Sequence, residues 1–264
     1  MGESIVITSG KGGVGKSTTS ANIGTGLALA GKKVCLVDTD IGLRNLDVLM
    51  GLENRIVYDL IDVVEKKCGV KQALIKDKRC EELYLLPAAQ TKDKTALDAR
   101  QLRWLTAELK ETFDYVIIDC PAGIEMGFKN AVSGADRAIV VTTPENAAIR
   151  DADRVIGLLE KEKVGSPKLL INRLRTQMVK EGGMMDVDEV VSVLSIDLLG
   201  VVPDDEEIIR SGNRGEPIVL HNKSLAAKAY RNITRRIQGE VVPLLVLDKE
   251  KKIMAKMKKW LGFA

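Results

Sequence analysis

Short runs of apolar, often β-branched residues recur along the chain, and longer segments with the apolar spacing of helices separate them. Several of these runs are apolar at nearly every position, which is typical of parallel strands buried on both faces. The pattern predicts strands at residues 4–8, 33–37, 83–86, 115–119, 138–142, 168–171 and 198–202. It predicts helices at residues 17–30, 96–110, 147–161 and 187–194.

The order of these elements predicts the fold class. Strands that alternate with helices at this spacing favour an α/β fold with a mostly parallel twisted sheet and helices on both faces. No internal repeat, low-complexity segment or Pro/Gly-rich linker divides the chain, and its character changes only near Pro243, before a lysine-rich tail. We therefore expect one domain at 1–247 and an appended amphipathic helix at 248–264.

The first predicted strand leads into a glycine-rich segment that matches the phosphate-binding pattern G-x-x-x-x-G-K-[ST]. It consists of Gly10, Lys11, Gly12, Gly13, Val14, Gly15, Lys16, Ser17 and Thr18. Glycines let the backbone approach a phosphate, and backbone N–H groups and the start of the next helix attract its charge. In such loops the lysine bridges the β- and γ-phosphates and the hydroxyl binds Mg²⁺. The pattern predicts an ATP and Mg²⁺ site with Lys16 and Ser17 in these roles.

Acidic residues follow two other predicted strands. Asp119 ends one apolar run, and Asp38 and Asp40 lie at the end of another. The carboxyl ends of parallel strands form the edge of an α/β sheet at which ligands bind. A single aspartate there would cap a helix or turn, but three acids near one phosphate loop favour a functional site. Asp119 is suited to hold Mg²⁺ through water.

Lys11, a second lysine directly after the first loop glycine, resembles the deviant P-loop of the MinD/ParA-type ATPases. The resemblance continues through residues 38–47 and 119–125 and covers nearly the whole chain. It implies an ATP-dependent homodimer in which Lys11 reaches the partner's nucleotide. It also implies that Asp38 supports a switch and that Asp40 orients the attacking water. Asp40 would join Ser17 and Asp119 at the Mg²⁺ site.

The same resemblance implies further contacts. Asn172, with Pro203 and Asp204, would face the adenine. Asp151 and Asp153 would belong to an interface with a division inhibitor of the MinC type. A topological regulator, either of the MinE type or a pole-anchored scaffold, would complete the set of partners. Cys120 and Gly183 depart from residues often found at these positions in related sequences.

The net charge of the chain is concentrated in the tail. Residues 248–264 carry six lysines and two acids, a net charge of +4, so the remaining 34 basic and 35 acidic side chains give a net charge of −1. This distribution does not favour a broad nucleic-acid-binding face.

The tail has the spacing of an amphipathic helix. At about 100° per residue, its apolar residues fall within an arc of roughly 120°. These are Ile253, Met254, Met257, Trp260 and Leu261, and the other face carries lysines that include Lys252, Lys256 and Lys259. A basic face opposite Trp and Met is typical of a helix that lies in an anionic membrane surface. The alternatives are a helix packed on the core and a helix that docks in a partner's groove.

The chain's composition and cysteine spacing narrow its location. No apolar run approaches the roughly 18 residues of a membrane-spanning helix, and the first residues lack the pattern of a signal peptide. The four cysteines lie far apart with no C-x-x-C pair, as is typical of reduced cytosolic thiols. We expect a cytoplasmic protein that is peripheral on the inner face of the cell membrane when ATP is bound.

These features favour an ATP-dependent dimerising switch with slow, partner-stimulated hydrolysis. It would recruit a division inhibitor to the membrane to position the septum, and hydrolysis would release it. Three alternatives remain: a ParA-type DNA-partition ATPase, a flagellar-number ATPase of the same superfamily, and an iron–sulfur protein. The charge of the main domain disfavours the first. The last needs paired, exposed thiolates, and the position of Cys35 in a buried-looking strand disfavours it.

Overall fold

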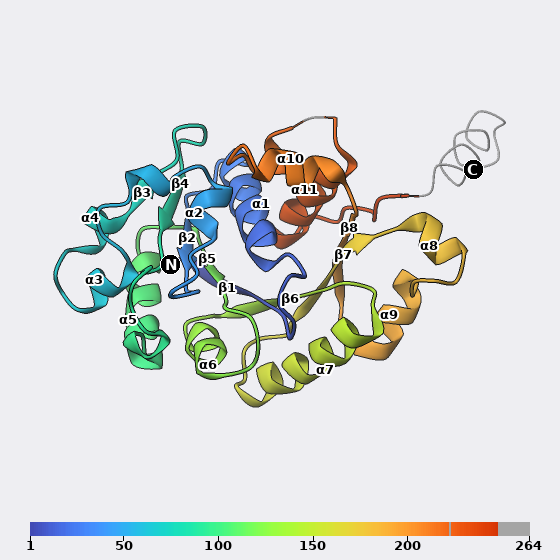
Figure 1. Ribbon diagram of the computed structural model, residues 1–264, viewed down its shortest axis with the longest axis horizontal. Coiled ribbons are helices and arrows are strands. Elements are labelled where there is room, and N and C mark those ends of the chain that lie inside the picture. The colour runs from blue at the N-terminus through green and yellow to red at the C-terminus, as the bar shows by residue number, and fades with distance from the viewer. Residues whose placement is uncertain (222, 248–264) are drawn as a thin grey trace.

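The computed structural model describes residues 1–221 and 223–247. These residues form an eight-stranded sheet in the order β3-β4-β2-β5-β1-β6-β7-β8, and β3–β4 is the antiparallel pair in an otherwise parallel sheet (Figure 1). The strands are β1 (Glu3–Thr8), β2 (Val34–Asp38), β3 (Ile75–Lys76), β4 (Leu83–Leu86), β5 (Tyr115–Asp119), β6 (Arg137–Thr142), β7 (Lys168–Leu174) and β8 (Leu198–Pro203). The predicted α/β fold class is confirmed.

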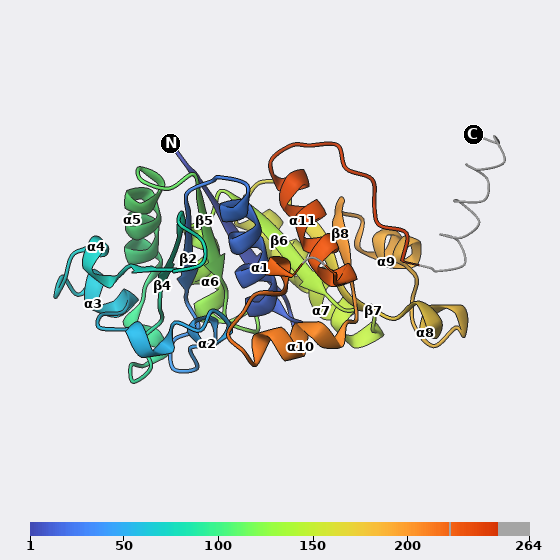
Figure 2. The ribbon, with the colours of Figure 1, turned by 90° about the horizontal axis from the view of Figure 1, so that it is seen from above.

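Helices cover both faces of the sheet (Figure 2). They are α1 (Lys16–Leu29), α2 (Leu46–Leu49), α3 (Leu60–Val64), α4 (Val70–Ala73), α5 (Ala99–Lys110), α6 (Met126–Ser133), α7 (Asn146–Lys161), α8 (Thr176–Lys180), α9 (Val187–Leu194), α10 (Glu206–Gly212) and α11 (Leu225–Ile237). Short 3-10 turns are η1 (Glu53–Arg55), η2 (Lys94–Ala96) and η3 (Ile218–Leu220).

Two cores lie on opposite faces of the sheet because successive side chains of a strand point in opposite directions. In β1, Ile5 and Ile7 pack with α1 and α11, whereas Val6 packs with α5, α6 and α7. All three side chains are fully buried. Burial on both faces explains why the strands are apolar at almost every position, and it holds β1 rigidly in the middle of the sheet.

Several predicted boundaries differ from the structure. The helix expected at 96–110 begins only at Ala99, because Asp98 caps α5 and accepts hydrogen bonds from the backbone N–H groups of Arg100 and Gln101. The strand expected at 168–171 continues to Leu174, with register shifts against β8. Helices α6, α10 and α11 were not predicted from the sequence. In α11 three of the seven buried residues are alanines, which give a weak apolar signal.

The tail and the domain boundary remain predictions. No helix within residues 1–221 and 223–247 is long and apolar enough to span a membrane. Residues 248–264, with the predicted lipid-facing side chains Ile253, Met254, Met257, Trp260 and Leu261 and lysines 252, 256 and 259, lie outside the described residues.

Candidate functional site

The loop between β1 and α1 has the backbone of an anion cradle. Gly13 and Gly15 have φ values of 79° and 99°, which residues with a Cβ rarely adopt. Gly15 is the N-cap of α1, and the first turn of α1 contains no acidic residue that would occupy its N–H groups. A helix start of this kind, entered through glycines, binds phosphate groups.

Lys16 is a buried cation with a neutral partner. Its side chain is 8% exposed, and Nζ donates a hydrogen bond of 3.1 Å to Ser9 Oγ. Within the described residues, no carboxylate lies close enough to Lys16 Nζ to form an ion pair. Buried charges in proteins are normally paired with opposite charge. The cradle therefore fits an anionic ligand with its charge beside Lys16 Nζ, as the phosphates of a nucleotide would place it.

The ends of β2 and β5 bring two carboxylates to the same edge of the sheet. Asp38 and Asp119 are paired in the sheet register, and both are almost completely buried. Asp38 accepts hydrogen bonds from the backbone N–H groups of Asp40 at 2.9 Å and Leu46 at 3.2 Å. Burial raises the pKa of both carboxyl groups, and the neighbouring charge of Asp119 raises that of Asp38 further. Two buried acids side by side favour a bound cation, and carboxylate and hydroxyl oxygens are the ligands that Mg²⁺ prefers.

Side chains that sequence reasoning missed hold Asp119 in place. Ser20, from the second turn of α1, donates a hydrogen bond of 2.9 Å to Asp119 Oδ1. The Thr39 hydroxyl donates to the backbone oxygen of Asp119 at 2.6 Å. Hydrogen bonds from Ser17 and Ser20, with the charge of Lys16, oppose the rise of the Asp119 pKa caused by burial. Ser20 lies in the same helix as the P-loop serine, but its partner is 99 residues away, so its role has no local sequence signal.

Asp40 begins a compact loop between β2 and α2. The backbone oxygen of Asp40 accepts hydrogen bonds from Leu43 and Arg44 N–H groups, and Arg44 has a φ of 40°. Arg44 Nε lies 2.8 Å from Oδ2 of the fully buried Asp47. Burial raises the Asp47 pKa, and the Arg44 charge opposes that rise. The loop that carries Asp40 is therefore fixed by the hydrogen bonds to Asp38 and by the Arg44–Asp47 ion pair.

Lys11 and Gly10 connect the loop to α7. The Lys11 side chain is 45% exposed, and its Nζ lies 3.9 Å from a carboxylate oxygen of Glu145, the N-cap of α7. A Cβ on Gly10 would come within 2.2 Å of the backbone oxygen of Asp151. The structure thus places Asp151 partly against the phosphate loop, whereas Asp153 is exposed on α7. The reach of Lys11 into a partner stays a prediction.

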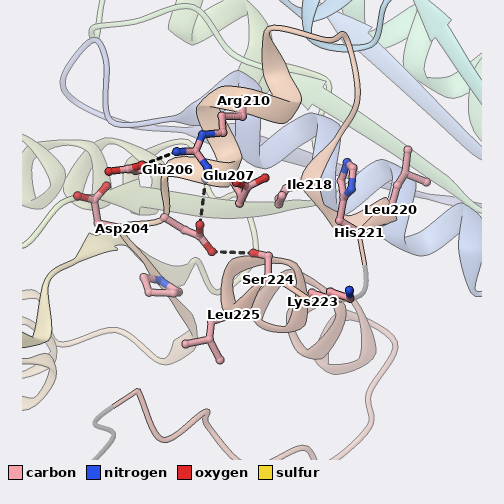
Figure 3. Close-up of a pocket in the computed structure, with 12 residues that line it drawn as sticks. Asp204, Glu206, Glu207, Arg210, Ile218, Leu220, His221, Lys223, Ser224 and Leu225 are labelled. Carbon is pink, nitrogen blue, oxygen red and sulfur yellow. Dashed lines mark hydrogen bonds and ion pairs between the residues drawn. The ribbon is translucent and has the colours of Figure 1, made fainter.

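The three residues predicted to face the adenine occupy two places. Asn172 is buried, donates a hydrogen bond of 2.8 Å to the backbone oxygen of Val14, and would collide with any side chain at position 15. Pro203 and Asp204 line a cavity of about 940 Å³ between the start of α10 and the loop before α11 (Figure 3). Arg210 and Lys223 also line this cavity, which is large enough for a nucleoside. Asn172 supports the loop, and the other two border the cavity.

The cysteines lack the arrangement of an iron–sulfur site. Cys35, Cys80 and Cys120 are buried, and Cys68 is partly exposed. Burial raises the pKa of the Cys120 thiol to about 12, which disfavours the thiolate that binds metals. Within the described part of the chain, no three His, Cys, Asp or Glu side chains are grouped as metal ligands.

Comparison with known proteins agrees with the geometry. The family model described as ParA, NUBPL iron-transfer P-loop NTPase, matches residues 1–238. The septum site-determining protein MinD of Bacillus subtilis (strain 168) is 65% identical over 265 residues, covering 99% of this chain and 99% of its own.

Two solved structures have the same fold. A MinC:MinD cell division protein complex from Aquifex aeolicus matches with a TM-score of 0.86 and 49% identity, over 92% of this chain and 98% of that one. MinD complexed with Mg-ADP from Pyrococcus horikoshii matches with a TM-score of 0.81 and 29% identity, over 90% of this chain and 96% of that one. The chain belongs to the septum site-determining MinD proteins, within the ParA/MinD family of P-loop ATPases.

Proposed function

We propose that this ATPase is a dimerising switch, placed on the membrane by ATP and released by hydrolysis, that positions division by recruiting an inhibitor. The observation that carries the proposal is the buried Lys16, which has a neutral partner beneath a glycine cradle and whose charge acts on the buried carboxyl group of Asp119. This arrangement supports binding of a nucleoside triphosphate with Mg²⁺, the ion named with ADP in the Pyrococcus relative.

Each residue of the site has a proposed task. Lys16 and the N–H groups of the glycine loop hold the phosphates, and Pro203 and Asp204 border the space for the base. Ser17, Asp119 and Asp40 would hold Mg²⁺, which neutralises charge on the phosphate oxygens when bound. Asp40 orients the attacking water. Asp38 anchors the loop that carries Asp40, because its carboxyl group binds backbone N–H groups at both ends of that loop.

Lys11 is proposed to complete the site of a second subunit. Its side chain is half exposed and its ion pair with Glu145 is long, so it is available to turn outward. A cation supplied in trans raises phosphoryl-transfer rates by several orders of magnitude. Hydrolysis would then depend on dimerisation.

The membrane-bound dimer is proposed to act through two kinds of partner. The Aquifex relative was solved as a MinC:MinD complex, and we propose that an inhibitor of the MinC type binds this chain near Asp153 on α7. Asp151, which lies partly against Gly10, would link that surface to the phosphate loop. A topological regulator, of the MinE type or a pole-anchored scaffold, would trigger release.

The tail is proposed to bind anionic lipid weakly. A dimer presents two tails, and the second engages at high effective concentration, which increases the apparent affinity about 100-fold or more. ATP would therefore place the protein peripherally on the inner face of the membrane.

The central test is co-sedimentation with anionic vesicles in ATP, in ADP and without nucleotide. Binding with ATP alone supports the switch, and equal binding in ATP and ADP contradicts it. Lys16→Ala should lose the ATP effect, and Asp40→Ala should bind ATP and lipid but hydrolyse ATP poorly. Trp260→Glu should abolish lipid binding and leave ATP-dependent dimerisation intact.

A second test addresses Lys11. A mixture of Lys11→Ala and Asp40→Ala proteins should contain some heterodimers with one intact composite site, and these should hydrolyse ATP. Normal dimerisation and hydrolysis by Lys11→Ala alone would contradict the assignment in trans. A ParA-type protein binds DNA through phosphate contacts, which are strongest at low salt. We expect that this protein does not retard duplex DNA in a gel even at low salt.

A further inference from the structure

The segment before the tail is apolar throughout and is fixed to the body of the protein. Residues 241–247 are seven consecutive apolar residues. The Arg236 guanidinium, from the last turn of α11, donates hydrogen bonds of 2.8 Å to the backbone oxygens of Val242 and Pro243. It also donates one of 2.9 Å to the backbone oxygen of Leu199 in the edge strand β8. One side chain thus ties the segment to the sheet.

Some side chains of this segment are partly buried against the body of the protein, and others are exposed. Leu245 and Leu247 are partly buried and pack against the two apolar cores. Val241 is fully exposed, Leu244 is 46% exposed and Val246 is 50% exposed. We call Val241, Leu244 and Val246 the outer strip. Single exposed apolar residues are ordinary, but several within six positions on a fixed segment mark a surface that binds something.

The outer strip lies close in the chain to the proposed lipid-binding tail. Ile253 lies six positions after Leu247, which packs on the body of the protein. Whatever the conformation between them, six residues reach at most about 21 Å. If Ile253 enters a lipid surface, the outer strip must lie within about that distance of it. The lysines that follow would gather anionic lipid beside the strip.

We propose that Val241, Leu244 and Val246 form a second lipid-contacting element that adds apolar contact to an anionic membrane surface beside the tail. This inference rests on the proposed function. The segment carries no charge between Glu240 and Asp248, so no ionised group would need to be desolvated at the lipid surface. A second copy of the chain is a poorer occupant, because a stable interface buries about 1,200 Å² or more and three side chains supply only a small part of that.

The test compares two double variants of the full chain in co-sedimentation with phosphatidylglycerol–phosphatidylcholine vesicles and ATP. Leu244→Ser with Val246→Ser removes most of the outer strip. Val57→Ser with Val193→Ser is the matched control, since these valines are exposed apolar residues elsewhere, at 79% and 53%. We expect about tenfold weaker vesicle binding for the strip variant, unchanged binding for the control, and ATP-dependent dimerisation in both.

A second measurement reports contact directly. With Trp104→Phe, Trp260 is the only remaining native tryptophan, and Val246→Trp adds a second one within the outer strip. When ATP is added, brominated lipid should quench more tryptophan fluorescence in this variant than in the Trp104→Phe protein alone. Val57→Trp in the same background should not show this increase.

The outcomes separate this inference from the proposed function. Absence of ATP-dependent vesicle binding in the wild type would contradict the proposed function itself. Normal wild-type binding with equal binding of the strip variant would overturn this inference alone. Loss of ATP-dependent dimerisation in the strip variant would show that the strip contacts a second copy of the chain. Vesicle binding by the strip variant in ADP would show that the strip covers the tail when ATP is absent. Either result would overturn the proposal.

Discussion

The ends of β2 and β5 carry the same residue at the same level of the sheet, yet the two carboxylates are held in different ways. Asp38 accepts hydrogen bonds from the backbone N–H groups of Asp40 and Leu46, so its oxygens are used by the chain itself. Asp119 is supported by the Ser20 hydroxyl from α1 and lies in the field of Lys16. Burial raises the pKa of both, and the negative neighbour raises that of Asp38.

The difference indicates that one of these two carboxylates has a structural role and the other a ligand-binding role at the same edge of the sheet. A carboxyl group whose oxygens bind two backbone amides serves as well without its charge, provided that it keeps an oxygen acceptor. A carboxylate flanked by hydroxyl groups and a lysine is better placed to remain ionised and to bind a cation. We therefore infer that Asp38 shapes the loop that carries Asp40, whereas Asp119 serves the ion.

Replacement of Asp119 should remove the ion-binding role. Asp119→Asn keeps the shape and one oxygen but loses the charge, so we expect Mg²⁺-dependent ATP hydrolysis to fall about 100-fold or more. Stimulation of ATP binding by Mg²⁺ should also be lost. Titration of nucleotide affinity against Mg²⁺ checks this, and an Asp119→Asn protein with normal Mg²⁺ dependence would contradict the assignment.

The stability of the protein should depend on the acceptor oxygens of Asp38 rather than on its charge. Asp38→Ala leaves two backbone N–H groups without an acceptor, and each costs about 1–3 kcal/mol of stability. Asp38→Asn retains an acceptor and should be destabilised much less. Denaturant unfolding of the nucleotide-free proteins measures both values. If Asn and Ala were equally harmful, the charge of Asp38 would be what matters and the comparison would fail.

The raised pKa values predict how the nucleotide-free protein responds to pH. Burial raises the pKa of Asp38, and less strongly that of Asp119, above the unfolded value near 4, so stability should fall as pH rises from about 4 through the folded pKa values, with Asp119 ionising before Asp38. The slope is at most about 1.4 kcal/mol per pH unit for each retained proton. Groups with lowered pKa values, such as Asp136, act in the opposite sense at lower pH. Unfolding midpoints from pH 4 to 8 measure the slope, and Asp38→Asn should flatten it.

Ser20 offers the smallest and most selective change. Ser20→Ala removes the hydroxyl that donates to Asp119 Oδ1 but leaves both carboxylates in place, so we expect Mg²⁺ affinity to weaken about tenfold or less. Thr25→Val is the matched control, since Thr25 is buried in the same helix and its hydroxyl has no partner within the described residues. Ser20→Thr should restore part of the affinity. An equal effect of Thr25→Val would mean that the helix is perturbed in general.

The parts of this site that are local in the chain could be predicted from the sequence. The glycine loop, the strand ends at Asp38 and Asp119 and the fold class all follow from patterns within a few residues. Some exact bounds could not be predicted, because side chains decide them: Asp98 starts α5 by accepting N–H groups that an uncapped helix would leave unpaired.

The supports of the site could not be predicted because they join distant segments. Ser20 meets Asp119, and Asn172 meets the backbone of Val14, across 99 and 158 residues. The close approach of Gly10 to Asp151 is likewise invisible until α7 is placed on the sheet. Composition also hid α11, whose inner face is rich in alanine. A single sequence shows which residues do the chemistry more readily than which residues hold them.

The central position of β1 has a consequence for how the chain is made. Glu3 pairs with Tyr115, and the backbone N–H of Ser4 donates to Asp136, 132 residues later. The first strand synthesised therefore has no partner in the sheet until β5 exists, when nearly half of the chain has been made, which takes on the order of ten seconds at typical elongation rates. Parallel pairing over such separations is slow because loop closure comes before any gain from contact. Nucleotide cannot assist those early steps. It can only stabilise the sheet after the strand has been enclosed.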